Sequence, residues 1–114
     1  MTKIYISGPI TGQENYKIRF AQAEVLIKTL HAEPVNPANN PANNPDGLAY
    51  REYINLCMKQ LMSSDMMLML PGWELSNGAT LEKAYADTVN MPVILTEAVS
   101  GGLQFTKVMR RRQP

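Results

Sequence analysis

The sequence has 114 residues, 45% of them hydrophobic and 18% charged, with 11 Lys and Arg against 10 Asp and Glu. This size and composition predict a single globular domain over residues 1–114. The near-zero net charge argues against a protein that binds nucleic-acid polymers through a broad basic surface. One cysteine excludes an internal disulfide and fits a reducing compartment. With no features of a signal peptide and no membrane-spanning apolar run, we expect a cytoplasmic protein with no membrane partner.

The first third of the chain predicts a strand, a helix and a strand in turn. Residues Lys3–Ser7 are mostly β-branched and aromatic, which predicts a strand. From about Glu14 to His31, apolar residues recur at three- and four-residue spacing, which is typical of an amphipathic helix. The segment Pro34–Pro37 predicts a short strand near a sheet edge, because proline donates no ladder hydrogen bond.

In residues 36–47 the motif Asn-Pro-Ala-Asn occurs twice, and the segment is rich in residues that favour turns. This stretch predicts a loop that is longer than a minimal connection. Two interpretations stay open, a flap near a functional site and an inserted surface loop.

The remaining chain predicts two further helix–strand pairs and a final short element. The expected elements are a helix at about 48–62, a buried apolar strand at 66–70, a helix from Ser76 to about Val89, a short strand at 93–95 and a last element at 103–109 before a basic tail at 110–114. Alternating strands and helices predict an α/β domain with a central parallel sheet of 4–5 strands. Ligands in such folds bind at the carboxyl ends of the strands, here near residues 5–12, 36–47 and 71–82.

Glu82 is the strongest candidate for chemistry in that crevice. It follows the expected start of a helix, where the helix dipole favours the ionised form of a carboxyl group. An ionised, positioned carboxylate suits a nucleophile or a group that stabilises a sugar cation. The competing interpretation is a solvent-exposed Glu that pairs with Lys83 or another charge.

The helix start itself is a candidate anion site. Ser76, Asn77, Gly78 and Ala79 supply side-chain and backbone donors that suit a phosphate or carboxylate. Simple capping of the helix explains the same residues.

Two aromatic residues have open roles. Tyr5 ends the first expected strand, so its hydroxyl either points into the crevice or is the wet tip of a core residue. Trp73 follows a turn and is a candidate for a stacking lid over a base or for a dimer contact. With one His and one Cys, the sequence predicts no metal site and no cofactor.

Several motifs together resemble a family. These are YISGPITG at 5–12, Asn36-Pro37, and LPGWE at 70–74 followed by Ser76, Gly78-Ala79 and Glu82. Over about residues 1–96 they resemble DUF4406, a family common in phages and bacteria. That family is similar to nucleoside 2-deoxyribosyltransferases and 2'-deoxynucleoside 5'-phosphate N-hydrolases.

The resemblance implies a flavodoxin-like (Rossmann-like) three-layer sandwich that forms a homodimer or higher homo-oligomer, with sites completed by the neighbouring subunit. It also implies that Glu82 attacks C1' of the deoxyribose and that Tyr5 holds Glu82. Ser76 and Gly78 match the positions that contact a 5'-phosphate in the hydrolases. The remaining expected substrate contacts are Gly8, which would let the sugar approach closely, Trp73, Asn36, Asn77 and Ala79.

The sequence departs from those enzymes at one position. They carry an Asp on the preceding helix that handles the leaving base or the sugar, and that place falls at about Cys57. We therefore hold two hypotheses. The first is an N-glycosidase or transferase that acts on a (2'-deoxy)nucleoside 5'-monophosphate, and the second is a non-catalytic module that binds a nucleoside or nucleotide in the same crevice.

Overall fold

A computed structural model describes residues 1–10, 13–40 and 47–109. These residues form strands, α-helices and short 3-10 helices in the following order: β1 (Lys3–Ser7), α1 (Tyr16–Lys28), β2 (Glu33–Val35), η1 (Pro37–Asn39), α2 (Gly47–Met62), β3 (Met66–Met69), η2 (Trp73–Leu75), α3 (Asn77–Thr88), β4 (Val93–Val99) and β5 (Gly102–Met109).

The strands form one sheet in the order β2-β1-β3-β4-β5. β1 pairs in parallel with β2 and β3, and β3 pairs in parallel with β4. The predicted parallel sheet is therefore confirmed for these four strands. The last expected element is β5, a fifth strand that runs antiparallel to β4. The chain reverses there through Gly101, whose φ of 84° suits a tight turn, so no crossover helix separates the two strands.

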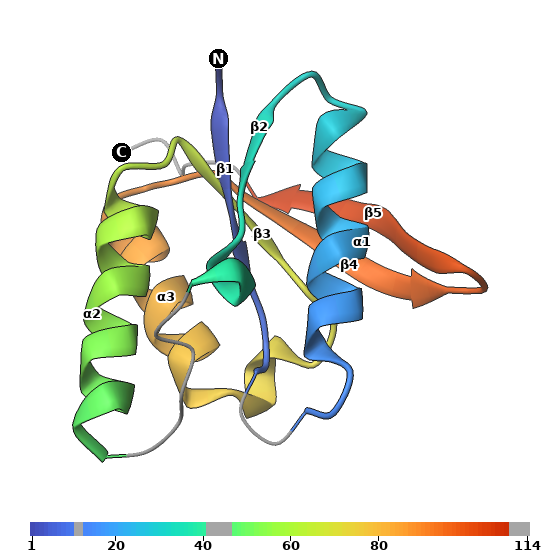
Figure 1. Ribbon diagram of the computed structural model, residues 1–114. Helices are drawn as coiled ribbons and strands as arrows, with labels where there is room; N and C mark the ends of the chain where they lie inside the picture. The colour runs from blue at the N-terminus through green and yellow to red at the C-terminus, as the bar shows by residue number, and fades with distance from the viewer. Residues whose placement is uncertain (11–12, 41–46, 110–114) are drawn as a thin grey trace.

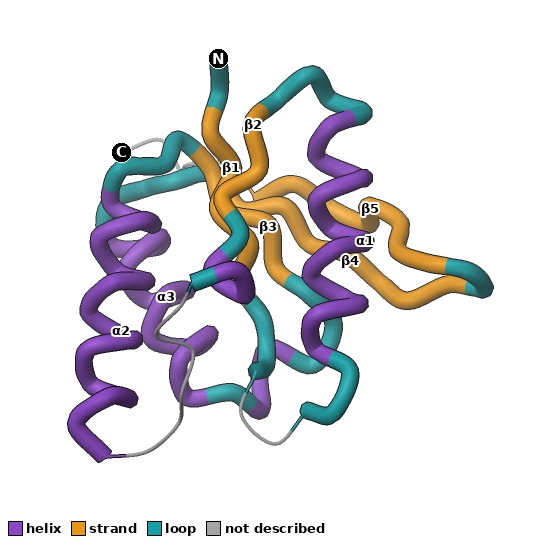
Figure 2. Tube along the Cα trace, in the orientation of Figure 1, coloured by secondary structure: helices purple, strands orange, loops and turns teal. Residues whose placement is uncertain are grey.

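The helices cover both faces of this sheet. Figures 1 and 2 show α1 on one side and α2 with α3 on the other, which is the predicted three-layer α/β arrangement. The β4–β5 hairpin extends beyond the helices (Figure 1). β2 lies at the sheet edge, as predicted from its proline, Pro34. β4 continues four residues past the predicted end at Leu95. The loop segment 41–46 and the basic tail 110–114 lie outside the described residues.

Two buried clusters hold the layers together, and β1 contributes to both. Successive side chains of a strand point to opposite faces. Ile4 and Ile6 join the cluster under α1, which includes Phe20, Ala23, Ile27, Leu68 and Leu70. Tyr5 joins the cluster under α2 and α3, which includes Tyr53, Cys57, Met67, Met69, Ala79 and Ala86. The apolar run 66–70 is thus split between the two faces, as expected for a strand buried on both sides.

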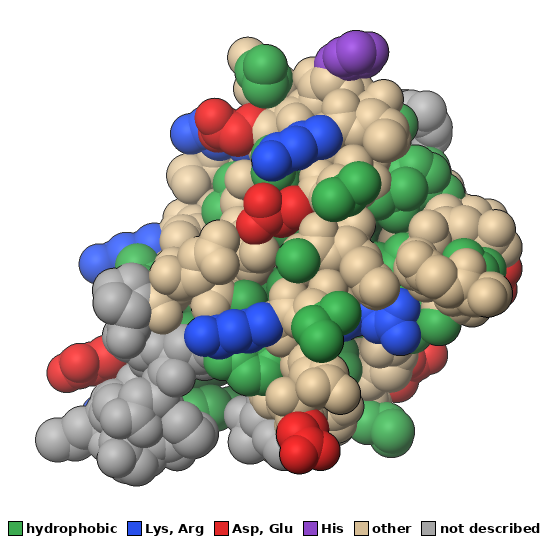
Figure 3. Space-filling model, turned by 45° about the vertical axis from the view of Figure 1, so that its right-hand side comes forward, with side chains coloured by type: hydrophobic (Ala, Val, Ile, Leu, Met, Phe, Trp, Pro, Cys, Tyr) green, Lys and Arg blue, Asp and Glu red, His purple; other side chains and the backbone are tan. Residues whose placement is uncertain are grey.

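The surface is mixed in character. On the face seen in Figure 3, acidic and basic side chains are interspersed among apolar and uncharged ones. Within residues 1–10, 13–40 and 47–109, no helix has the length and apolar character to cross a membrane.

Candidate active site

The carboxyl end of β1 and the first turns of α3 bring the main candidate residues together. Ser76 caps α3, and its hydroxyl accepts a hydrogen bond from the backbone N–H of Ala79 at 3.2 Å. One and a half turns later the helix presents Glu82 toward the sheet. There it meets Tyr5 and Ser7, which lie two residues apart on the same face of β1.

The Glu82 carboxylate is buried and held at both oxygens. Only 7% of the residue is exposed. The Tyr5 hydroxyl donates to Oε2 at 2.5 Å, and the Ser7 hydroxyl donates to Oε1 at 2.7 Å. Lys83 forms its ion pair with Asp87, at 2.6 Å. The interpretation of Glu82 as a solvent-exposed partner of Lys83 is therefore wrong.

Burial decides the protonation of Glu82. Loss of hydration disfavours the charged form and raises the pKa of Glu82 from 4.5 to about 7, while the hydrogen bonds from Tyr5 and Ser7 act in the opposite direction. The sequence predicted that the helix dipole would favour ionisation. The pKa of Glu82 is raised instead, because the side chain is buried and loses its hydration. Burial, with the Glu82 charge second, also raises the pKa of Tyr5, which stays neutral and can donate.

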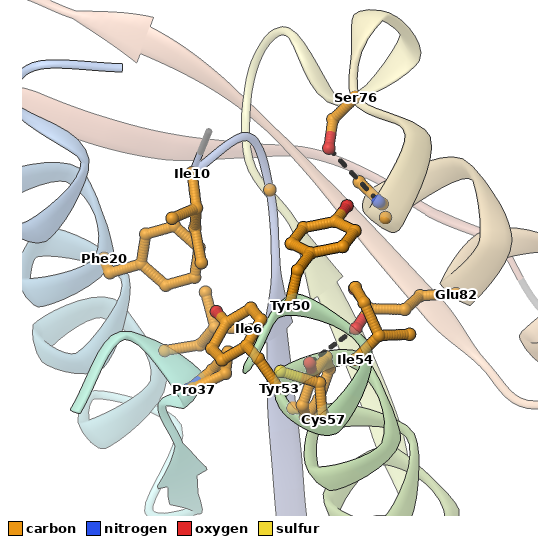
Figure 4. Close-up of a pocket in the computed structure, with 14 residues that line it drawn as sticks. Ile6, Ile10, Phe20, Pro37, Tyr50, Tyr53, Ile54, Cys57, Ser76 and Glu82 are labelled. Carbon is orange, nitrogen blue, oxygen red and sulfur yellow. Dashed lines mark hydrogen bonds between the residues drawn. The ribbon is translucent and has the colours of Figure 1, made fainter. Parts of the chain in front are cut away.

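Glu82 lies at a pocket between α2, α3 and the end of β1. Figure 4 shows Ser76 and Glu82 along one side and Ile10, Phe20 and Pro37 along the opposite side. Its lining also includes Tyr5, Gly8, Tyr50, Tyr53, Cys57, Gly78 and Ala79. The free volume of about 40 Å³ admits a few water molecules.

A wider cavity of about 410 Å³ adjoins this pocket over the start of α3. The two share Tyr50, Ser76 and Gly78, and Asn77 lines the wider one. The backbone N–H groups of the first helical turn lack partners within the helix, so this end of α3 favours an anion. Ser76 and Gly78 at this helix start line the same pocket as the buried Glu82 carboxylate.

The two α2 residues beside Glu82 are neutral. Burial raises the pKa of the Cys57 thiol and raises that of Tyr53 well above its usual range. Cys57, at the place where the resemblance expects an Asp, is 3% exposed and lines the pocket. Among the described residues, the buried Tyr53 hydroxyl has no hydrogen-bond partner.

Of the other predicted site residues, Gly8 lines the pocket, and Asn36 and Trp73 do not. Gly8 lines the pocket, but a Cβ there would lie 2.8 Å from the Leu70 side chain, so its smallness serves strand packing as well as ligand approach. Asn36 caps η1 and donates to Glu24 at 2.6 Å, outside the lining of the pocket. Trp73 is also outside that lining, and the Lys83 ammonium lies 6.0 Å from its ring centroid.

Three residues of the site were not predicted from the sequence: Ser7, which donates to Glu82, and Tyr50 and Tyr53, which line the pocket. Ser7 follows Tyr5 by two positions on a predicted strand, so the period of two was the available signal. Tyr50 and Tyr53 are three residues apart on a predicted helix and share one face. Among the described residues, no group of His, Cys, Asp and Glu could hold a metal ion.

The sequence and the fold were compared with known proteins. The family model described as "Domain of unknown function (DUF4406)" matches residues 2–95. No protein of curated function matches the sequence.

Two solved structures share the fold. A 2-deoxyribosyltransferase from the psychrotolerant bacterium Bacillus psychrosaccharolyticus aligns with a TM-score of 0.67 and 17% identity, over 84% of this chain and 72% of that one. A conserved protein from Enterococcus faecalis V583 aligns with a TM-score of 0.64 and 24% identity, over 83% of this chain and 62% of that one. At these identities the likeness concerns the fold. The match over residues 2–95 spans most of the sequence, and the chain therefore belongs to the DUF4406 family.

Proposed function

We propose that this protein cleaves or transfers the N-glycosidic bond of a (2'-deoxy)nucleoside 5'-monophosphate, with Glu82 as the nucleophile. The observation that carries the proposal is a buried carboxylate with both oxygens held by hydroxyls of β1. A carboxylate fixed in this way loses little orientational freedom when it attacks. The shared fold with a 2-deoxyribosyltransferase supports the same reaction class.

The chemical step needs the ionised form of Glu82. A carboxylate oxygen bonds to C1' of the sugar, the C1'–N bond breaks, and its electron pair leaves with the base, which takes up a proton. Water or a second base then attacks C1', and the Glu82 carboxylate is released. Tyr5 and Ser7 are positioning residues in this scheme. Their hydrogen bonds keep the pKa of Glu82 from rising further, so that a sizeable fraction is ionised near neutral pH.

The phosphate is assigned to the start of α3. Ser76 and Gly78 line both the pocket and the wider cavity, and Ala79, whose N–H donates to the Ser76 hydroxyl, lines the pocket alone. A phosphate there interacts favourably with the positive end of the helix dipole. This placement leaves the sugar between the helix start and Glu82.

The second candidate function is nucleotide binding without turnover. The observation that favours it is the absence of an acid beside Glu82 on the described part of α2, where Tyr53 and Cys57 are both neutral. A leaving base then has no strong proton donor in the described pocket lining.

Base release tests the proposal. Wild-type protein is incubated with ribo- and deoxyribonucleoside 5'-monophosphates, and free bases are separated by chromatography beside Glu82→Gln. We expect release from at least one deoxynucleotide and none from the variant. Glu74→Gln, which removes an exposed carboxylate from η2, is the matched control and should behave as wild type.

The other outcomes have definite meanings. No release by wild type, together with a saturable thermal shift from one nucleotide, would overturn the enzyme proposal in favour of binding alone. Exchange of the base only when a second free base is added would identify a transferase.

A further inference from the structure

The hydroxyl of Tyr53 is the starting point. Tyr53 is 6% exposed, and among the described residues its hydroxyl oxygen has no hydrogen-bond partner. The nearby Cys57 thiol, through its charge and a weak hydrogen bond, contributes to the raised pKa of Tyr53, but it does not meet the distance and angle of a full hydrogen bond to the hydroxyl oxygen. An unpaired buried hydroxyl costs stability, and native proteins rarely keep one without a reason.

The surroundings of Tyr53 tell what such a group would recognise. Ile6, Phe20 and Pro37 line the same part of the pocket and bring only carbon atoms from their side chains. The Tyr53 hydroxyl is therefore the hydrogen-bonding group that this apolar side offers. Since burial raises its pKa, the hydroxyl stays protonated and can both donate and accept.

The position of Tyr53 relative to Glu82 and Ser76 sets which part of a ligand it meets. Figure 4 shows Ser76 and Glu82 on one side of the pocket, with Phe20 and Pro37 across from them. A nucleotide with its phosphate at Ser76 and its C1' at Glu82 directs its base away from both. That direction leads toward Phe20 and Tyr53.

We infer that Tyr53 is a specificity-determining residue whose hydroxyl forms a hydrogen bond with one edge of the nucleobase. The inference rests on the proposed function, because that function orients the ligand. The free volume of about 40 Å³ means that only a small part of a ligand, such as the edge of a base, reaches this hydroxyl. Ligand pockets are lined mostly by apolar and aromatic side chains, and a few polar groups among them give specificity.

The test uses Tyr53→Phe in the full-length protein and measures binding by thermal shift and titration calorimetry. The probes are deoxynucleoside 5'-monophosphates and 2-deoxyribose 5-phosphate, which keeps the sugar and phosphate but has no base. We expect about a tenfold weaker affinity for the preferred nucleotide. Affinity for 2-deoxyribose 5-phosphate should stay at the wild-type value.

The free protein supplies an independent readout. Removing a hydroxyl without a partner should leave the melting temperature unchanged or raise it. Tyr85→Phe is the matched control, because Tyr85 packs against the same cluster but lies outside the pocket lining. It should change neither nucleotide affinity nor preference.

Each contrary result is decisive. Equal nucleotide binding by wild type and Tyr53→Phe would overturn the role of Tyr53 and leave the proposed function standing. Equal weakening for 2-deoxyribose 5-phosphate would assign the hydroxyl to the sugar and overturn base recognition. A markedly lower melting temperature would mean a structural hydroxyl. No binding of any nucleotide by wild type would overturn both proposals.

Discussion

The two faces of β1 are both buried but are chemically different. Under α1, β1 presents Ile4 and Ile6 to other apolar side chains. Under α2 and α3, the same strand presents Tyr5 and Ser7 to a carboxylate. Burial stabilises both faces through the hydrophobic effect, and on the second face it also penalises the charged form of Glu82 through lost hydration. Because its side chains alternate, β1 contributes only apolar contacts on one face and the hydrogen bonds to Glu82 on the other.

The largest expected effect is on the apolar face. Ile27 is 0% exposed, so Ile27→Ala should lower the free energy of unfolding by about 2–5 kcal/mol through lost contacts and a cavity. Chemical denaturation measures it. Val25→Ala on the same helix is the control, since Val25 is 66% exposed and should cost less than about 0.5 kcal/mol. Equal losses of unfolding free energy in the two variants would contradict a core in which Ile27 is packed and Val25 is not.

The polar face should respond to pH in a defined direction. The pKa of Glu82 is raised from 4.5 to about 7 on folding, so the folded state binds the extra proton between these values. This contribution to stability is fully present below pH 4.5 and is lost as pH rises through 7, a change of about 3 kcal/mol.

Glu82→Gln should remove that change. The difference in unfolding free energy between variant and wild type is then expected to move in favour of the variant as pH rises from 4.5 to 8. Denaturation at a series of pH values measures it, and charges common to both proteins cancel. A difference that does not vary with pH would rule out the raised pKa.

The smallest expected effect separates the two donors to Glu82. Tyr5→Phe and Ser7→Ala each remove a hydrogen bond that lowers the pKa of Glu82, so each should move its titration to higher pH. The shift should be larger for Tyr5→Phe, because its hydrogen bond lowers the pKa more. The midpoint of the pH–stability curve reports it. Ser64→Ala is the control, because Ser64 is buried but bonds to Gln60.

Much of the fold was predictable because local signals agreed. The apolar run at 66–70, the alternating β1 and the capped α3 each follow from residue pattern alone. The direction of β5 did not, since strand pairing depends on the path of the chain in space. Gly101-Gly102, between two runs with strand character, was the available hairpin signal.

The site was less predictable, for a physical reason. Spacing placed Tyr5, Ser76 and Glu82 near one crevice, and the structure brings Tyr5 and Glu82 into contact. The spacing of residues in the sequence does not tell how deeply a side chain is buried, however, and burial is what raises the pKa of Glu82. It also gave no sign that Tyr53 lacks a partner or that Asn36 is occupied with Glu24, because both facts depend on neighbours distant in sequence.

The two hydroxyls that bond to Glu82 also limit how many hydrogen atoms fit around its carboxyl group. When the carboxylate is ionised, the Tyr5 hydroxyl donates its hydrogen to one oxygen of Glu82 and the Ser7 hydroxyl donates to the other. The acid form carries a third hydrogen; where it lies between Glu82 and Tyr5 or Ser7, that partner rotates its hydroxyl and accepts. The turned hydroxyl then needs a new acceptor for its own hydrogen. A ligand atom that accepts at that point would be bound more tightly by the acid form than by the ion.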